Sequence, residues 1–256
     1  MSEPTHRRRG IYLLPNLLTT GNLFSGFYGI VSIMSANYVR AAVAVFVAVV
    51  FDILDGQIAR YTKTSSRFGL EYDSLADLVS FGIAPGLLIY TWALTGYGRL
   101  GWVAAFLFVA CGALRLARYN VQAGSGDGRY FMGLPIPAAA GLIAATVLLD
   151  DHILRLGKEL RPIIILLMTY ALAFLMVSRV RYRAFKVVQL PQRRLFELLV
   201  GAVLTLIMFT LAPQVMLFAV FVIYALSGLV ETPLRLLLAR KARRPPLMEG
   251  GEHRAR

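Results

Sequence analysis

The stretch FDILDGQIARYTKTSSRFGLEYDSLADLVSFG, residues 51–82, carries the pattern that decides the fold and the chemistry of this chain. It places four aspartates inside sequence that is otherwise apolar enough to form membrane-spanning helix: Asp52, Asp55, Asp73 and Asp77. A carboxylate at the centre of a bilayer costs roughly 2.5–3.5 kcal/mol on insertion scales. Four aspartates within 26 residues therefore require a compensating ligand. A divalent cation is the obvious candidate.

The composition of the whole chain is that of an integral membrane protein. Of its 256 residues, 57% are hydrophobic and 16% are charged, and the mean hydropathy is +0.64. Soluble domains are about 45–50% apolar and about 25% charged. We expect an all-α polytopic membrane protein with about eight transmembrane helices. The apolar stretches are residues 15–34, 41–58, 72–94, 102–116, 135–149, 163–177, 196–211 and 215–238.

The chain shows no repeat and no long linker, which favours a single membrane domain over residues 1–256. Within it we expect a basic N-terminal segment at 1–12 and a transmembrane bundle at 13–240. Residues 241–256 combine prolines, glycines and charge, which is typical of a disordered tail.

Positive charge is distributed unevenly along the chain. The net charge is +13, and with eight spans and the N-terminus inside, 22 of the 27 Lys and Arg residues lie on the cytoplasmic side. The positive-inside rule therefore predicts that both termini and the aspartate motif are cytoplasmic. The basic runs at 179–194 and 235–244 are explained by attraction to lipid headgroups. We expect membrane lipids, and no nucleic acid, as partners.

The spacing of the aspartates predicts a metal site. Asp52 and Asp55 are three residues apart, and Asp73 and Asp77 are four apart, so each pair shares a helix face. If the two helices pack antiparallel across the short loop between them, the pairs converge. Oxygen donors without nearby His or Cys suit Mg²⁺ or Mn²⁺ rather than zinc.

Small residues and an arginine accompany the first aspartate pair. Gly56 and Ala59 leave space for a ligand or a neighbouring helix close to the backbone. The Arg60 guanidinium can form hydrogen bonds with a phosphate. As an alternative, single aspartates can cap helices or pair with Arg60, Arg67 or Arg115. All four aspartates occur together with the glycines at fixed spacing, which favours a metal site over these separate roles.

The spacing D-x2-D-G-x2-A-R-x8-G-x3-D-x3-D is complete in this chain and resembles the signature of the CDP-alcohol phosphatidyltransferases. Further segments are similar to the membrane-embedded phosphatidylserine synthase branch, the CDP-diacylglycerol–serine O-phosphatidyltransferases. They are PNLLTTGNLFSGFYGI (15–30), DSLADLVSFGIAPG (73–86), RLARYNV (115–121) and FMGLPIPAAAG (131–141). The likeness covers residues 10–145, while the last third matches only as hydrophobic helices.

The resemblance implies a site with two divalent cations, Mg²⁺ or Mn²⁺, between the second and third helices. It implies Asp52, Asp55, Asp73 and Asp77 as metal ligands, with Asp77 also the catalytic base. It places the CDP-lipid against Gly56, Ala59, Arg60, Ser65, Ser66 and Gly69.

The pocket for the acceptor alcohol is less sharply defined. Arg115 and Arg118 are candidates for binding the carboxylate of serine or a phosphate, and Asn120 could add a hydrogen bond. Their alternative role is to set membrane topology. Asn16, Thr19 and Thr20 could line the site or bond to neighbouring helices.

The resemblance implies transfer of the phosphatidyl group of CDP-diacylglycerol to L-serine, which gives phosphatidylserine and CMP. It also implies a homodimer in a prokaryotic inner or cell membrane. A sibling enzyme could use glycerol 3-phosphate, inositol phosphate or choline instead. Outside this class, membrane carboxylates also line the cation pathways of transporters and channels.

Overall fold

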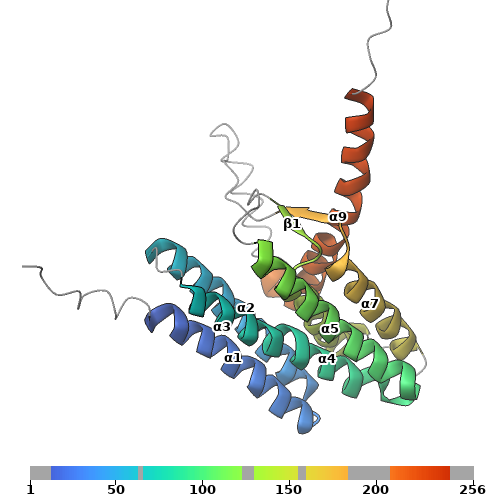
Figure 1. Cartoon of the computed structure of the whole chain (residues 1–256). Coiled ribbons are helices and arrows are strands. Elements are labelled where there is room, and N and C mark those ends of the chain that lie inside the picture. Colours follow the sequence, from blue (N-terminus) through green and yellow to red (C-terminus); the bar gives the residue numbers. More distant parts are fainter. Residues whose placement is uncertain (1–12, 63–65, 123–129, 155–159, 184–207, 243–256) are drawn as a thin grey trace, which may run out of the picture.

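The structure is a computed structural model that describes residues 13–62, 66–122, 130–154, 160–183 and 208–242. Its described residues form a bundle of helices (Figure 1). Four helical runs are long and apolar enough to cross a membrane: Leu13–Met34, Tyr38–Thr62, Arg67–Gln122 and Ile136–Leu154. Two shorter apolar helices are Arg161–Val177 and Pro213–Leu229.

The first two helices form a tight antiparallel hairpin. Helix α1 spans Leu13–Met34 and α2 spans Tyr38–Thr62, and the turn between them contains Ala36 with φ 54°. A Cβ built on Gly29 of α1 would lie 3.5 Å from the Cβ of Ala44 on α2. Small residues at this crossing let the two backbones approach closely.

The run Arg67–Gln122 is not one straight helix. It contains α3 (Arg67–Asp77), the π-helical turn η2 (Leu78–Ile83), α4 (Ala84–Ile89), η3 (Tyr90–Leu94), the 3₁₀ turn η4 (Thr95–Tyr97) and α5 (Gly98–Gln122). Its 56 residues would extend about 84 Å if straight, far beyond a bilayer core of about 30 Å. The chain turns at Gly98, where φ is 51°, and α5 packs back against α4 and η2. The run therefore supplies two of the expected helices, 72–94 and 102–116.

Helix α6 (Ile136–Leu149) lies in the middle of the bundle and packs against α2 and α9 (Pro213–Ala242). Nearly all of its side chains are buried, and many are alanine. It continues into the π-helical turn η5 (Asp150–Leu154). There buried Asp150 forms an ion pair of 2.9 Å with Arg161 of α7 (Leu160–Val177). The Arg161 guanidinium also lies over the ring of Trp92.

A short antiparallel ladder, which the all-helical expectation does not include, joins β1 (Tyr130–Met132) to β2 (Arg181–Arg183). Gly133 follows β1 with φ 81°, and a Cβ there would overlap the carbonyl oxygen of Met176. The buried Tyr182 hydroxyl donates to the Ala225 carbonyl in α9 at 3.0 Å. Burial raises the pKa of Tyr182 to about 12.

The expected number of eight helices stays a prediction. The expected helix at 196–211 lies outside the described residues except for 208–211, and so do the N-terminal segment 1–12 and most of the predicted tail. Helix α9 extends to Ala242, two residues into that predicted tail. The single-domain organisation likewise stays a prediction.

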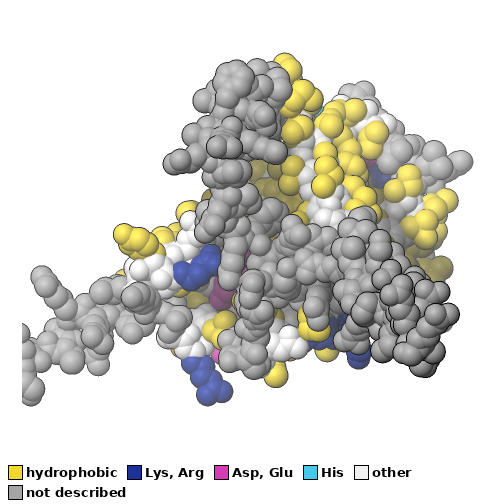
Figure 2. Space-filling view, turned by 90° about the horizontal axis from the view of Figure 1, so that it is seen from above, with side chains coloured by type: hydrophobic (Ala, Val, Ile, Leu, Met, Phe, Trp, Pro, Cys, Tyr) yellow, Lys and Arg dark blue, Asp and Glu magenta, His cyan; other side chains and the backbone are white. Residues whose placement is uncertain are grey.

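The surface of the bundle is rich in exposed apolar side chains, as Figure 2 shows for one face. Phe24 of α1, Phe106 of α5 and Phe174 of α7 are 66%, 63% and 71% exposed. Soluble proteins rarely expose large contiguous apolar surface. These helix faces suit contact with lipid, as an integral membrane protein requires.

Candidate active site

The carboxylates of three of the four predicted metal ligands, two on α2 and one on α3, come close to one another. Carboxylate oxygens of Asp52, Asp55 and Asp73 all lie within 4.8 Å of one another. We call these three residues the aspartate cluster. Asp52 and Asp55 come from the same face of α2 and Asp73 comes from α3, whereas Asp77, the second residue of the α3 pair, is not part of the cluster.

Helix α1 supports the cluster from the side. Thr19 donates a hydrogen bond of 2.8 Å from Oγ1 to Oδ2 of Asp55, which is only 5% exposed. The same hydroxyl also contacts the Pro15 carbonyl oxygen at 3.1 Å. This contact between α1 and α2 fixes the orientation of the Asp55 carboxylate.

Asp77 lies one turn beyond the cluster, at the end of α3, and is 7% exposed. Its Oδ1 accepts a hydrogen bond of 2.9 Å from the amide nitrogen of Asn22, a fully buried residue of α1. Ser80 in turn donates to the Asn22 carbonyl oxygen at 2.9 Å. The π-helical turn η2 begins directly after Asp77, and such turns are frequent at functional sites.

The cluster fits a hard divalent cation. Asp73 Oδ1 is buried and has no hydrogen-bond partner among the described residues. Leaving a buried polar group unpaired costs about 1–3 kcal/mol, and more for a charged one. An all-oxygen donor set with an unpaired carboxylate oxygen is the kind of site that Mg²⁺ or Mn²⁺ occupies.

A pocket with a volume of about 140 Å³ opens beside the cluster. It is lined by Pro15, Asn16, Thr19, Asp55, Gly56, Ala59, Ser66, Gly69, Leu70 and Asp73. We call it the glycine-lined pocket. A Cβ on Gly56 would meet only Arg60, at 4.0 Å, so the backbone there is open to a ligand.

The start of α3 gives this pocket a positive edge. Ser66 is the N-cap residue of α3, and its Oγ accepts a hydrogen bond of 2.9 Å from the Gly69 N–H. The N-terminus of a helix carries a partial positive charge and unpaired N–H groups, which together attract phosphate. A Cβ on Gly69 would lie 3.1 Å from Ser66 Oγ, so glycine keeps room for the cap.

Arg60, which is also predicted for the CDP-lipid, is not among the described residues that line the pocket. Arg60 is exposed, and its Nε donates to the Gly56 carbonyl oxygen at 2.9 Å, which holds the side chain along α2. Thr20, which is predicted for the acceptor site or for a contact between helices, is exposed and bonds to Tyr72 at 2.9 Å, joining α1 to α3. Ser65 lies outside the described residues.

The three polar residues predicted on α5 lie in different surroundings. Arg115 is 8% exposed, its Nε has no hydrogen-bond partner among the described residues, and it interacts electrostatically with Asp77. Arg118 instead donates to the Val177 carbonyl oxygen at 3.1 Å, at the end of α7. Asn120 donates to Ser74 at 2.9 Å.

Comparison with known proteins identifies the family of the chain. A sequence model described as CDP-alcohol phosphatidyltransferase matches residues 12–226, which is most of the chain. The chain belongs to the CDP-alcohol phosphatidyltransferase family. The family is generally dependent on divalent metals, which agrees with the aspartate cluster.

Several curated relatives of this phosphatidyltransferase carry specific names. A CDP-diacylglycerol–serine O-phosphatidyltransferase of Helicobacter pylori is 42% identical over 181 residues, covering 70% of this chain and 75% of the relative. The protein of the same name from Bacillus subtilis is 33% identical over 173 residues, or 68% and 91% of the two chains. An archaetidylserine synthase of Methanothermobacter thermautotrophicus is 37% identical over 171 residues, or 66% and 69%.

Asn22 is not among the site residues predicted from sequence, although its side chain donates a hydrogen bond to Asp77. One signal could have indicated it. Asn22 follows Thr19 by three residues, so both project from the same face of α1. A polar pair on one face of an apolar helix predicts a partner in the bundle interior.

Proposed function

We propose that this chain transfers the phosphatidyl group of CDP-diacylglycerol to the hydroxyl of L-serine, which gives phosphatidylserine and CMP. The observation that carries the proposal is the aspartate cluster beside the glycine-lined pocket, in a chain of the CDP-alcohol phosphatidyltransferase family. The names of its relatives support serine as the acceptor rather than another alcohol. A cation transporter or channel is not favoured.

The metal ligands would be the cluster together with Asp77, holding two divalent cations, Mg²⁺ or Mn²⁺. Bound cations of this kind neutralise phosphate oxygens and stabilise the charge that develops on a leaving group. The unpaired Oδ1 of Asp73 supports this assignment, because that buried oxygen otherwise has no compensating charge or donor among the described residues.

The glycine-lined pocket would receive the cytidine and pyrophosphate of the donor lipid. Gly56, Ala59 and Gly69 bring backbone rather than bulky side chains to its wall. The N-terminus of α3 would face the phosphates with its N–H groups. Arg60 is exposed, so its guanidinium is free to leave the Gly56 carbonyl and bind a phosphate oxygen.

Asp77 would act as the general base. Asn22 holds Oδ1 of this carboxylate, and the carboxylate accepts the proton of the serine hydroxyl as the serine oxygen attacks the phosphorus that bears diacylglycerol. A bond forms between that oxygen and phosphorus, the bond from phosphorus to CMP breaks, and CMP leaves with the electron pair. Arg115, buried near Asp77, would bind the serine carboxylate.

We further propose that the site and both termini face the cytoplasm and that the protein is a homodimer. The orientation rests on the excess of Lys and Arg on one side of the predicted spans. The homodimer rests on family resemblance alone.

The experiment that tests the reaction follows CMP release by purified protein in detergent, with CDP-diacylglycerol, Mg²⁺ or Mn²⁺, and each candidate alcohol in turn. We expect release with serine only, abolished by EDTA. Asp77→Asn should lower the rate by about 10²–10⁴-fold, because it removes the base. Asp151→Asn, an exposed aspartate in η5, is the matched control and should leave the rate unchanged.

Two outcomes would contradict the proposal. CMP release with another alcohol would support the phosphatidyl transfer but show that serine is not the acceptor. If the folded protein releases no CMP with any alcohol but carries cations into vesicles, the protein is a transporter and not this enzyme.

A further inference from the structure

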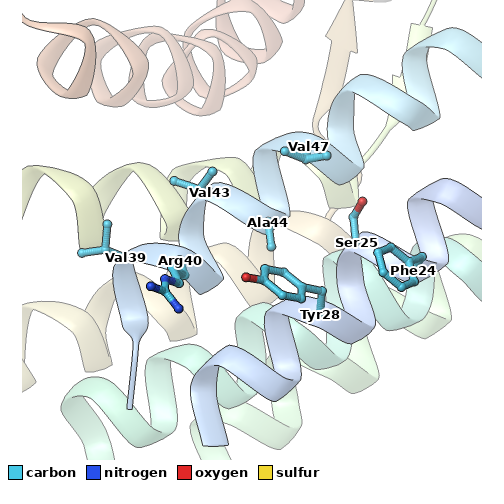
Figure 3. Close-up of a pocket in the computed structure, with 8 residues that line it drawn as sticks. All are labelled: Phe24, Ser25, Tyr28, Val39, Arg40, Val43, Ala44 and Val47. Carbon is cyan, nitrogen blue, oxygen red and sulfur yellow. The ribbon is translucent and has the colours of Figure 1, made fainter. Parts of the chain in front are cut away.

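A second pocket lies between the halves of α1 and α2 that are remote from the aspartate cluster. It is lined by Phe24, Ser25, Tyr28, Val39, Arg40, Val43, Ala44 and Val47 (Figure 3). We call it the α1–α2 groove. Its volume is about 400 Å³, within the range of about 300–1,000 Å³ that is usual for ligand pockets.

The groove is separate from the active site. Arg40 and Asp55 are 15 residues apart on α2, which places them about 22 Å apart along the helix axis at a rise of 1.5 Å per residue. Since α2 is long enough to span the bilayer, Arg40 lies toward one membrane face and the aspartate cluster toward the other. A donor lipid held at the cluster would therefore belong to the opposite leaflet.

The groove is apolar along two helical turns. Phe24 is 66% exposed and Val43 is 47% exposed, so both present hydrocarbon at the surface of the bundle. The Ser25 hydroxyl donates to the Gly21 carbonyl of its own helix at 2.8 Å, so its proton is already hydrogen-bonded. Such a surface suits an acyl chain.

One end of the groove carries a positive charge. Arg40 is exposed in the first turn of α2, and its guanidinium forms no hydrogen bond or ion pair with another described residue. Figure 3 shows the ring of Tyr28 between the two helices, with its hydroxyl toward the Arg40 side. A guanidinium at a membrane face forms strong charge-assisted hydrogen bonds with phosphate.

We propose that the α1–α2 groove binds one anionic glycerophospholipid of the leaflet opposite the aspartate cluster. Its phosphate lies on Arg40, and one acyl chain lies along Val43 and Val47. The cation at one end and the apolar path leading away from it match the two parts of such a lipid. The site is independent of the proposed reaction.

The test measures lipid retained by the purified full chain in native mass spectrometry, with phosphatidylglycerol or phosphatidylcholine as the added probe. We expect one phosphatidylglycerol per chain and weaker retention of phosphatidylcholine. Arg40→Gln should lower phosphatidylglycerol retention about tenfold, because it removes hydrogen bonds to a charged group. Val43→Trp should lower it by filling the groove without changing charge.

Arg99→Gln is the matched control, because Arg99 is exposed at the start of α5 and does not line the groove. It should retain phosphatidylglycerol as the unmodified chain does, and all three variants should keep the CMP release rate. Equal retention by Arg40→Gln and Arg99→Gln would overturn the proposal. So would equal binding of the two lipids, or disulfide cross-linking of two chains through Val43→Cys, which would place a second copy in the groove.

Discussion

At the scale of single residues, Asn22 decides how Asp77 is held. Its amide donates to Asp77 Oδ1 at 2.9 Å in a buried environment. Losing a hydrogen bond to a charged group costs about 1.5–3 kcal/mol. We expect Asn22→Ala to lower kcat about 10- to 100-fold while KM for CDP-diacylglycerol changes little.

The matched control for Asn22→Ala is Ser25→Ala on the same helix, because among the described residues the Ser25 hydroxyl bonds only to the Gly21 carbonyl oxygen of α1. Steady-state CMP release distinguishes the two variants. Equal kcat values for them would show that the Asn22 contact does not position Asp77.

The role of Gly56 in the glycine-lined pocket can be tested by substitution, because the packing around it leaves space for a methyl group. A Cβ there would meet only Arg60, at 4.0 Å. Alanine is about 1 kcal/mol more favourable than glycine inside a helix. Gly56→Ala should therefore keep or raise the melting temperature, yet raise KM for CDP-diacylglycerol because the methyl group enters the glycine-lined pocket.

Gly96→Ala is the control for this change, because a Cβ at Gly96 meets nothing within 4 Å and the residue is outside the site. Thermal unfolding and CMP release are measured for both variants. An unchanged KM for Gly56→Ala would show that the donor lipid does not bind against Gly56 in the glycine-lined pocket.

At the scale of elements, α2 and α3 meet through carboxylates that repel each other unless a cation joins them. A ligand that binds only the folded state at 100 times its Kd stabilises it by about 2.7 kcal/mol. Mg²⁺ should therefore raise the melting temperature of the purified protein by several degrees. Asp73→Asn should reduce that increase and raise the melting temperature measured in EDTA, because one negative charge is removed.

The same thermal scan with Asp151→Asn provides the control, since Asp151 is exposed in η5 and is not part of the cluster. This measurement does not depend on catalysis. A melting temperature that is insensitive to Mg²⁺ would contradict a metal site between the two helices.

At the scale of the whole molecule, the prediction concerns orientation in the membrane. Ser35 lies in the turn after α1, and Tyr61 is 92% exposed at the other end of α2. The positive-inside rule places Tyr61 in the cytoplasm. In intact cells, a membrane-impermeant maleimide should label Ser35→Cys, and it should label Tyr61→Cys only after permeabilisation.

The native Cys111 is buried, so the unmodified chain should give little background label. The opposite labelling pattern would reverse the proposed orientation and place the active site outside the cytoplasm.

Local sequence could predict only that part of the candidate site whose geometry is set within one helix. The helical repeat alone brings Asp52 and Asp55 onto one face of α2, and composition alone indicates a membrane protein. The number of helices is harder to predict, because several apolar stretches are shorter than a bilayer requires. Single-residue inspection could not show that Arg118 donates to the end of α7 while Arg115 stays buried near Asp77.

The sequence by itself determined the apolar membrane-spanning character of the helices, the spacing of the aspartates and the family. Only the tertiary structure decided how α1 supports the site through Thr19 and Asn22, and that a groove forms at the far end of the same helix pair. The β1–β2 ladder also belongs to the tertiary level. The physical reason is range: periodicity and spacing act within one helix, whereas these contacts join segments that are far apart in the chain.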